Sequence, residues 1–426
     1  LNVDDLAAML ASGDTTIKST NTNPDIEIDA ALRWTSTSRL TLDSYHSIAF
    51  NKPVVVAGTG AMTITTNDGG SGGDFRFFKK GHVEFWDLKS DLTINGRGYV
   101  LVNKLKQLAL DIRHNNIGYY ALAKNINTKK RTYAGAPIDH SFEGTFEGLG
   151  NIVSNLTIQS ASGIQAGLFS DLVTVFAVIR DVGLTSVKIS GSDADIGALV
   201  GANNDGTIMN SYATGEVSGA GQSHVGGLVG FTNSTVMNSY ADVAVSNSGS
   251  GGAAGGLVGY LRGDCLRGCD GVIDNSFAVG LVMAGDDSSA GGLVGYSFGG
   301  IITNSYAVGA VSVGNSGSVG GMIGINTDNT DVHTGPVVLF SYATGLVTGG
   351  SGATVGGLIG QDVPDSQNTN SYWDMDTSGI SDPSQGAGNI ANDPGITGLT
   401  DAQFKSGLPA GFDKKVWKQK GSVNNG

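Results

Sequence analysis

A five-residue phrase rich in glycine recurs along the second half of the chain, and an aromatic residue follows each copy. In one copy, Gly226-Gly-Leu-Val-Gly230 is followed by Asn238-Ser-Tyr240. The central apolar residues of the six copies are Leu199, Leu228, Leu257, Leu293, Met322 and Leu358. Successive copies are 29, 29, 36, 29 and 36 residues apart. A period in this range is typical of repeat architectures, so the repeat constrains the fold more than any other feature.

The variation in repeat length falls on one side of the repeat. From each aromatic residue to the next phrase the distance is 16 or 17 residues, whereas from the phrase to its aromatic residue it varies from 12 to 20. Solenoids tolerate insertions in this way, as loops on one face. The long insertions of the third and fifth repeats contain residues 262–270 and 326–335.

Each repeat has too few apolar residues to form a core alone. Its apolar runs are short and of β type, with Gly, Ser, Asn and Asp between them and no helical period. One repeat therefore predicts one coil of an all-β, right-handed parallel β-helix, in which stacking about 4.8 Å apart places Leu over Leu and Tyr over Tyr. We expect the glycines to supply positive φ or close backbone approach. We expect the Asn before each Ser-Tyr pair to form a side-chain ladder.

The flanking segments have a different texture. Residues 1–97 contain nine candidate strands and a possible short helix at residues 3–10. Residues 98–160 form a lead-in, where Leu101, Leu105, Leu108 and Ile112 lie at helical spacing and predict a capping helix over 101–114. The repeat β-helix then covers residues 161–373, and an irregular segment of residues 374–426 is expected to cover the last coil.

Composition excludes several classes of protein. The net charge is −13 and Lys plus Arg number only 25, which argues against nucleic acid as a partner. Glycine is abundant (67 residues) but proline is scarce (8), so the composition does not predict disorder. No apolar run approaches the length of a membrane span. The chain has no signal peptide and begins at Leu1, so we expect a processed product or a fragment.

The two cysteines lie in the insertion of the third repeat. Cys265 and Cys269 have no further Cys or His nearby in sequence, which disfavours a metal site. A local disulfide in an oxidising compartment is favoured over two free thiols. We expect no cofactor, although a weak calcium site at Asp328–Asp331 stays open.

The repeat phrases resemble the GLUG motif. The segment that begins Tyr119-Tyr-Ala-Leu-Ala is similar to the lead-in that commonly precedes such repeats. Leu40-Thr-Leu-Asp-Ser-Tyr-His and the ending Tyr372-Trp-Asp-Met-Asp resemble filamentous-haemagglutinin-type exoproteins. This resemblance implies a β-helical protein on the surface of, or secreted by, a Gram-negative bacterium, often by two-partner secretion and often with a role in adhesion. The chain would then be an internal or processed piece.

The function predicted from these observations is a non-enzymatic adhesin segment. A rigid rod would present the loops at 262–270 and 326–335 to a glycan or a host or cell-surface protein, and other segments of the parent exoprotein would flank it. Exposed aromatic faces and Asp or Asn hydrogen bonds would contact a glycan. Arg262-Gly-Asp264 also matches the integrin tripeptide. The candidate binding residues are Arg262, Asp264, Asp328, Asp331, His333 and Trp373. For Trp373 a position in the core is an equal alternative.

Two alternatives stay open. Parallel β-helices host polysaccharide hydrolases and lyases, and the two long insertions lie at the same corner two coils apart, or roughly 10 Å. The candidate catalytic residues would be Asp264, Asp270, Asp328 and Asp331. No phosphate loop, nucleophile elbow or zinc-protease motif is present. The second alternative is a purely structural stalk.

Overall fold

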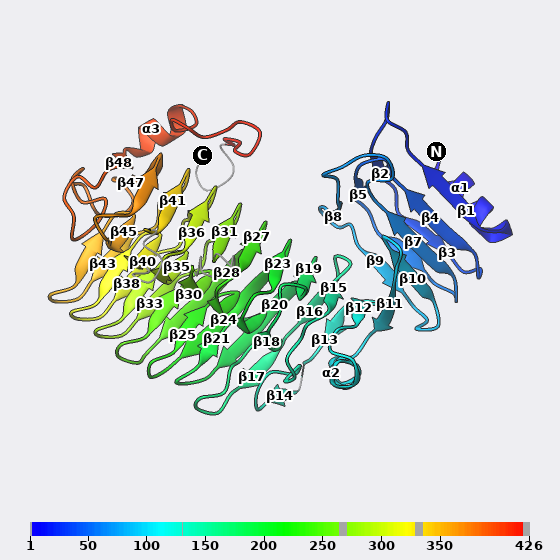
Figure 1. Cartoon of the computed structure of the whole chain (residues 1–426), viewed down its shortest axis with the longest axis horizontal. Helices are drawn as coiled ribbons and strands as arrows, with labels where there is room; N and C mark the ends of the chain where they lie inside the picture. Colours follow the sequence, from blue (N-terminus) through cyan, green and yellow to red (C-terminus); the bar gives the residue numbers. More distant parts are fainter. Residues whose placement is uncertain (1, 130, 264–270, 329–334, 421–426) are drawn as a thin grey trace. The chain divides into compact units, whose positions relative to one another are not determined.

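The computed structural model describes residues 2–129, 131–263, 271–328 and 335–420. Within these residues the chain consists mainly of short β-strands stacked as parallel coils, together with three helices (Figure 1). It forms two compact units: unit 1 contains Leu1–Asn127, Glu143–Ser154 and Val178–Gly183, and unit 2 contains the remainder. Among the described residues, none of the helices has the length and hydropathy needed to cross a lipid bilayer. The predicted fold class, a parallel β-helix, is confirmed.

Unit 1 begins with stacked coils of three short strands. The strands of the first three coils are β1 (Thr15–Lys18), β2 (Ile26–Ile28) and β3 (Leu32–Trp34), then β4 (Arg39–Asp43), β5 (Ile48–Phe50) and β6 (Val54–Val56), then β7 (Ala61–Thr65), β8 (Phe75–Phe77) and β9 (Val83–Phe85). Each pairs in parallel with its counterpart, so that apolar residues such as Ile17, Leu42 and Ile64 stack inside. All nine strands predicted in residues 1–97 are present, and β3 was missed.

The remaining strands of unit 1 are β10 (Asp91–Ile94), β11 (Arg97–Val102), β12 (Tyr119–Leu122), β13 (Ile126–Asn127), β15 (Thr145–Glu147), β16 (Ile152–Ser154) and β19 (Val178–Arg180). The helix α2 (Leu105–His114) confirms the predicted helix, but Leu101 lies in β11. β11 and β12 pair in parallel on either side of α2, so this helix is an insertion between stacked strands. The first coil is covered instead by α1 (Val3–Ser12), which buries Leu6 and Leu10.

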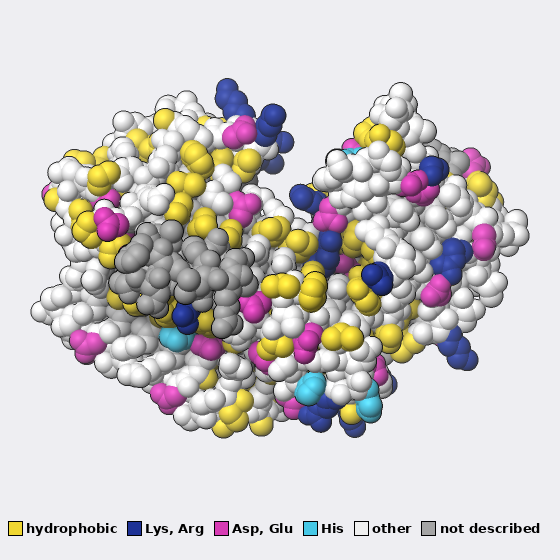
Figure 2. All heavy atoms as spheres, viewed as in Figure 1, with side chains coloured by type: hydrophobic (Ala, Val, Ile, Leu, Met, Phe, Trp, Pro, Cys, Tyr) yellow, Lys and Arg dark blue, Asp and Glu magenta, His cyan; other side chains and the backbone are white. Residues whose placement is uncertain are grey.

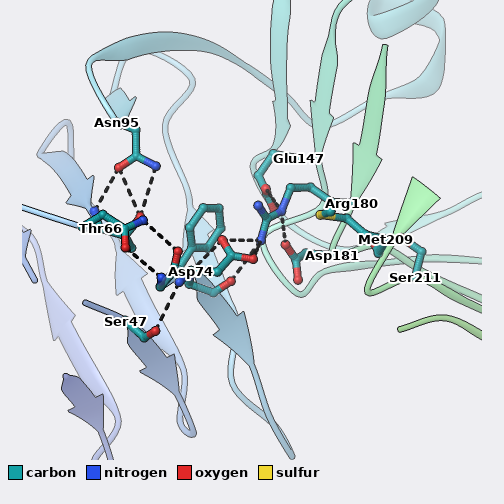
Figure 3. Close-up of polar contacts among 12 residues, drawn as sticks. Ser47, Thr66, Asp74, Asn95, Glu147, Arg180, Asp181, Met209 and Ser211 are labelled. Atoms are coloured by element: carbon teal, nitrogen blue, oxygen red, sulfur yellow. Dashed lines mark hydrogen bonds and ion pairs between the residues drawn. The ribbon is translucent and has the colours of Figure 1, made fainter. Parts of the chain in front are cut away.

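A buried charge cluster lies in unit 1 (Figure 3). The Arg180 guanidinium pairs with Asp181 at 2.6 Å, Asp74 at 2.9 Å and Glu147 at 3.3 Å, and it lies 4.2 Å from the centre of the Phe75 ring. Glu147 is completely buried. Burial and, secondly, the charge of Asp181 raise the pKa of Glu147 well above its ordinary value. A single cation therefore joins the loop before β8 to strands β15 and β19.

Unit 2 has larger coils. It starts with β14 (Thr132–Tyr133), β17 (Thr157–Gln159), β18 (Phe169–Leu172), β20 (Gly183–Ser190), β21 (Asp195–Ile196) and β22 (Val200–Asn203). The next two coils consist of β23 (Thr207–Met209), β24 (Tyr212–Gly219), β25 (His224–Gly226) and β26 (Val229–Thr232), and of β27 (Thr235–Met237), β28 (Tyr240–Asn247), β29 (Ala253–Gly255) and β30 (Val258–Arg262). One sequence repeat thus makes one coil.

The later coils keep this order. They contain β31 (Val272–Asp274), β32 (Phe277–Ala278), β33 (Val282–Ala284), β34 (Ser289–Gly291) and β35 (Val294–Phe298), then β36 (Ile301–Thr303), β37 (Tyr306–Ala307), β38 (Val311–Val313), β39 (Ser318–Gly320) and β40 (Ile323–Thr327), then β41 (Val337–Leu339), β42 (Tyr342–Ala343), β43 (Val347–Gly349), β44 (Thr354–Gly356) and β45 (Ile359–Gln361). The valine of each phrase pairs in parallel register with that of the next, as Val229, Val258 and Val294 do. The glycine-leucine phrases are therefore rungs of one stack, as predicted.

The glycines of the phrase are required by close backbone approach. A Cβ on Gly256 would lie 2.0 Å from the Gly292 carbonyl oxygen and 2.8 Å from the Cβ of Ala278. The equivalent glycines Gly227, Gly292 and Gly321 meet the next coil in the same way. None of these glycines has a positive φ, so of the two expected reasons close backbone approach is the one that applies.

Positive φ occurs instead at the residue before each Ser-Tyr or Ser-Phe pair. Five of these residues are Asn, with φ between 47° and 51°: Asn210, Asn238, Asn275, Asn304 and Asn370. Asn tolerates this left-handed conformation better than most residues. The expected Asn ladder forms only in part, between Asn275 and Asn238, where the Asn275 side-chain amide donates to the Asn238 Oδ1 at 2.5 Å. The continuous polar ladder is formed by the buried serines, where for example the Ser239 amide donates to the Ser276 hydroxyl at 3.1 Å.

Phe340 occupies this turn position in the fifth repeat with φ of 50°. A bulky side chain in the left-handed region is strained, whereas Asn and Gly adopt it readily. We expect Phe340→Asn to stabilise unit 2 by about 0.5–1 kcal/mol. Chemical denaturation followed by circular dichroism would measure the change. Asn304→Phe should destabilise by a similar amount, and a lower denaturation midpoint for Phe340→Asn would contradict the expectation.

The last coil ends the core differently from the others. Its strands are β46 (Gln367–Thr369) and β47 (Ser371–Asp374). β48 (Ile396–Leu399) pairs in parallel with β47 on the next rung, and the short helix α3 (Asp401–Ser406) follows. Residues 385–388 take the place of a further glycine phrase: the Leu358 amide donates to the Gly386 carbonyl oxygen at 2.9 Å, and Ile359 bridges to Ala387. In this coil Trp373 replaces the small alanine of the earlier coils and lies against Gly357. The large indole fills the end of the core.

Candidate functional site

An aromatic ladder runs along the outer face of unit 2. It consists of Tyr212, Tyr240, Phe277, Tyr306 and Tyr342, one residue per coil in parallel register. The ring centroids of neighbours are 4.7–5.1 Å apart and the ring planes lie within 4° of each other. All five side chains are partly exposed. The ladder follows from the fold, because the preceding turn and buried serine direct each ring outward.

The faces of these rings are not free. Neighbouring rings are parallel and separated by one strand spacing, so each interior ring has another ring on both faces. The edges and hydroxyl groups are what the ladder turns outward. Burial raises the pKa of Tyr212, and burial together with the neighbouring Tyr212 raises that of Tyr240. A ligand on this surface therefore meets ring edges, which carry the positive end of the aromatic quadrupole.

The C-terminal segment, residues 400–420, covers one end of the ladder. Thr400 starts α3 with a capping box that includes Gln403. The ring of Phe404 then lies 5.8 Å from Tyr342, and that of Trp417 lies 5.6 Å from Tyr342 and 6.0 Å from Tyr306. These rings are tilted 49–53° to the ladder, and Phe412 packs on Tyr342 and Tyr372 in a similar way. The segment thus packs on the end of the ladder through tilted ring pairs.

A groove of about 480 Å³ lies between the segment and the ladder. Its apolar lining includes Tyr306, Val308, Tyr342, Leu346, Phe412 and Trp417. Polar groups come from Asp374, Thr377 and Asp401, and the three residues Lys418–Lys420 also line it. The Trp417 Nε1 is buried and has no hydrogen-bond partner among the described residues. A volume of this size suits a small molecule or a few residues of an extended chain.

Apolar side chains continue beyond the groove on the same sheet. Leu346 is 49% exposed, and Leu281, just before β33, and Met283, within β33, are 44% and 45% exposed. Leu281 and Leu346 both precede paired inward-facing valines in the stack. Exposed apolar residues that gather on one face mark interaction sites more often than isolated ones do.

A pair of buried carboxyl groups anchors the chain just before the C-terminal segment. The Asp362 carboxylate accepts hydrogen bonds from Asn326 at 2.9 Å, Asn368 at 2.8 Å and Ser366 at 2.9 Å. Burial and, secondly, the charge of Asp362 raise the pKa of Asp393 to about 7. Asp393 Oδ2 has no hydrogen-bond donor among the described residues. A proton on Asp393 would let it donate to Asp362.

The raised pKa of Asp393 makes stability depend on pH. In the unfolded chain this group titrates near pH 4, so its contribution is complete below that pH and is lost as the pH rises toward 7. The amide of Asp393→Asn can donate a hydrogen bond to Asp362 at any pH, whereas the carboxyl group must first be protonated. We therefore expect this variant to raise the melting temperature at pH 7.5 and to have little effect at pH 4.5. Thermal melts of both proteins at the two pH values measure this difference. An equal shift at both pH values would contradict it, and Asp382→Asn, an exposed acid, is the matched control.

Most of the site residues predicted from the sequence lie outside the described residues: Asp264, Cys265, Cys269, Asp270, Asp331 and His333. Their roles, including the disulfide and the calcium site, stay predictions. Arg262 is exposed at the end of β30. Asp328 is partly buried, and its Oδ1 has no partner in the described part of the chain.

Trp373 requires a correction. It was a candidate for an exposed glycan-binding face, but its side chain is completely buried and its indole N–H donates to the Ile380 carbonyl oxygen at 3.2 Å. The aromatic residues that do line a groove, Phe404, Phe412 and Trp417, were not predicted as a site. The available signal was their recurrence in a short segment rich in lysine.

No group of three or more His, Cys, Asp or Glu side chains is arranged to hold a metal ion within the ranges that the structure describes. The lysines of the C-terminal segment are Lys405, Lys414, Lys415, Lys418 and Lys420, and all are exposed. Figure 2 shows dark blue side chains over the C-terminal segment at the top of the view. Their charge contrasts with the acidic remainder of the chain.

Comparisons with known proteins agree with the repeat. Residues 193–218 and 286–312 match the model of the GLUG motif. A stretch of 96 residues is 41% identical to halomucin of Haloquadratum walsbyi, and it covers 22% of this chain and 1% of that protein. A stretch of 54 residues is 37% identical to a protein described as a Gly-rich membrane protein of Evansella cellulosilytica, covering 13% of this chain and 6% of that protein. The chain therefore spans only a small part of these relatives.

Two solved structures are similar at 22% identity. One is described as an immunoglobulin A1 protease from Bacteroides ovatus, with a TM-score of 0.44 over 59% of this chain and 77% of that chain. The other is an IgA1 protease, with a TM-score of 0.46 over 62% of this chain and 20% of that chain. At these values neither likeness bears on activity. What the comparisons establish is that the chain carries the GLUG motif in at least two of its coils.

Proposed function

We propose that the chain is a non-enzymatic binding segment of a surface or secreted protein, and that it binds a protein partner in the groove beside the aromatic ladder. The groove between Tyr306, Tyr342 and the C-terminal segment is the observation that carries the proposal. The GLUG motif and the similarity to halomucin and a membrane protein support the location. The acidic, polar surface of the remainder suits solubility outside the cell.

The lining favours a protein ligand over a glycan. Sugars bind aromatic residues through ring faces, and the faces of the ladder rings are covered by their neighbours. The groove is bounded mainly by apolar side chains and continues into the exposed Leu346. An extended peptide with apolar side chains fits such a surface, because its backbone can use the few polar groups at the rim.

The test is a selection from a displayed library of random dodecapeptides, run beside a glycan array. Selected peptides are measured against the wild type and against Leu346→Asp, which puts a charge on the exposed wall of the groove. We expect at least tenfold weaker binding to the variant, since a charge is poorly tolerated in an apolar contact. Leu88→Asp, at a similarly exposed leucine of unit 1, should bind as the wild type does. Binders that ignore Leu346→Asp, or binding of glycans alone, would overturn the proposal.

The finer expectations from the sequence remain predictions. They are adhesion, a Gram-negative origin with two-partner secretion, the division at residues 97, 160 and 373, and contacts through residues 262–270 and 326–335. The hydrolase or lyase alternative is checked by incubating the chain with a panel of polysaccharides. We expect no new reducing ends or unsaturated products. If products form, the Asp328→Asn variant should be assayed as well, because Asp328 is the candidate catalytic residue that lies within the described part of the chain.

A further inference from the structure

The C-terminal segment leaves three rungs of the aromatic ladder uncovered. Within the described residues, the ring contacts of Tyr212, Tyr240 and Phe277 are with ladder neighbours only. The covered rungs, Tyr306 and Tyr342, also contact Trp417. The uncovered rungs have the same spacing and ring orientation as the covered ones. The ladder is thus one continuous track of which the chain itself uses one end.

The covered end shows what kind of chain packs on this track. The ring planes of Phe404, Phe412 and Trp417 are inclined at 39–53° to the ladder rings Tyr306 and Tyr342, so the segment packs on the ladder through tilted ring pairs. Such tilted pairs are favourable, because the edge of one ring is positive and the face of the other is negative. The segment also runs along the track. Phe412 contacts Tyr372 and Tyr342, whereas Trp417 contacts Tyr342 and Tyr306, one coil nearer to the uncovered rungs.

Charge distinguishes the uncovered part of the track. Asp242 and Glu216 are exposed beside Tyr240 and Tyr212, two and four residues along the outer side of their strands. Glu216 has one exposed partner, Lys188, at 3.8 Å, which is a weak pair. At the covered rungs the residues in the place of Asp242 are Val308 and Thr344. Exposed negative charge thus accompanies Tyr212 and Tyr240, whereas the residue in the same place beside Phe277 is Val279.

We infer that Tyr212, Tyr240 and Phe277 form a second docking surface, which binds an extended peptide of a partner protein that carries aromatic and lysine side chains. The aromatic residues of the peptide pack on the ladder rings at a tilt, as Phe412 and Trp417 do at the covered end. The lysines pair with Asp242 and Glu216. Leu281 and Met283, exposed beyond Phe277 on the same face, extend the apolar contact.

The probe is a fluorescently labelled synthetic peptide with the sequence of residues 401–420, which contains Phe404, Phe412, Trp417 and five lysines. Its binding to the full chain is followed by fluorescence anisotropy at low salt. We expect saturable binding that is about tenfold weaker for Phe277→Ser. The variant removes one rung on which the peptide packs, together with the contacts of Phe277 with Tyr240 and Tyr306. Asp242→Lys should weaken binding by a similar factor and, as an exposed substitution, leave the fold intact. Added salt should reduce the difference between Asp242→Lys and the wild type.

Two control variants distinguish the uncovered rungs from the other aromatic and apolar surfaces of unit 2. Tyr260→Ser removes a ring from a second stacked set on another sheet, where Tyr260 and Tyr296 lie 5.0 Å apart, and should not affect binding. Leu346→Asp tests the groove, so peptide binding lost only in that variant would assign the probe to the groove and overturn the second surface. Absence of saturable binding, or equal loss in Tyr260→Ser, would overturn it as well. If light scattering shows that copies of the chain associate through these rungs, or if a glycan replaces the peptide, the occupant is not a partner peptide.

Discussion

We expect Gly256→Ala to destabilise unit 2 by about 3 kcal/mol or more, although it adds one methyl group. The new Cβ would lie 2.0 Å from the Gly292 carbonyl oxygen, which belongs to the backbone of the next coil. A flexible side chain could move aside, but this atom is held in a stack of parallel strands on both sides. The coils would have to separate, and the hydrogen bond from the Gly256 amide to the Gly291 carbonyl oxygen would weaken with them. The denaturation midpoint measured by circular dichroism reports the loss.

Gly407→Ala is the matched control for this prediction. Gly407 ends α3 in the same unit, with φ of 161° and nothing within 4 Å of an added Cβ. It is extended backbone that any residue adopts, so the midpoint should hardly change. If Gly256→Ala were as stable as Gly407→Ala, close approach between coils would not explain the repeated glycine. The phrase would then need another cause.

The register of the repeats could be predicted because the spacing of the repeated residues determines it. The distance from each aromatic residue to the next phrase is nearly constant, 17 residues from Tyr240 to Leu257 and 16 from Phe277 to Leu293, and this leaves one way to stack successive copies. The strands of residues 1–97 were equally accessible, since apolar residues alternate with polar ones. What spacing does not reveal is which of two physical requirements selects a residue. Glycine serves both close approach and positive φ, and the structure assigns the second to Asn238 and its equivalents.

The candidate site was harder to predict, because it depends on how a non-repeating segment packs. The sequence of residues 400–420 gives no indication that Trp417 packs against Tyr306, which lies more than a hundred positions earlier. For a related reason the sequence left both an exposed position and a core position open for Trp373. Its neighbours in sequence resemble those of a partly exposed ladder residue, but it lies one position later and points into the core. Alternation along a strand separates an exposed ring from a buried one by a single residue.

The buried charge cluster of unit 1 was also absent from the predictions, because its members are distant in sequence. Arg180 meets Asp74 across 106 positions, and its pair with Glu147 joins two neighbouring strands of the stack. Two of the three carboxylates have lost almost all contact with water: Glu147 is fully buried and Asp181 is 5% exposed. Such groups are tolerated because a cation lies among them.

We therefore expect Arg180→Met to destabilise unit 1 by about 3–5 kcal/mol, since methionine fills part of the space but removes the cation that pairs with the fully buried Glu147. Lys18→Met is the matched control: Lys18 also pairs with two aspartates, Asp43 and Asp68, but its side chain is 58% exposed, so the loss should be below about 1 kcal/mol. Without Arg180 the pKa of Glu147 rises further, so the folded variant holds protons that the unfolded chain releases. The deficit of Arg180→Met should therefore shrink as the pH falls from 7 to 5, and adding Glu147→Gln should recover part of it at pH 7. Denaturation curves of the four proteins at both pH values measure these differences. A deficit that does not change with pH would mean that packing against Phe75, and not charge, is what Arg180 contributes.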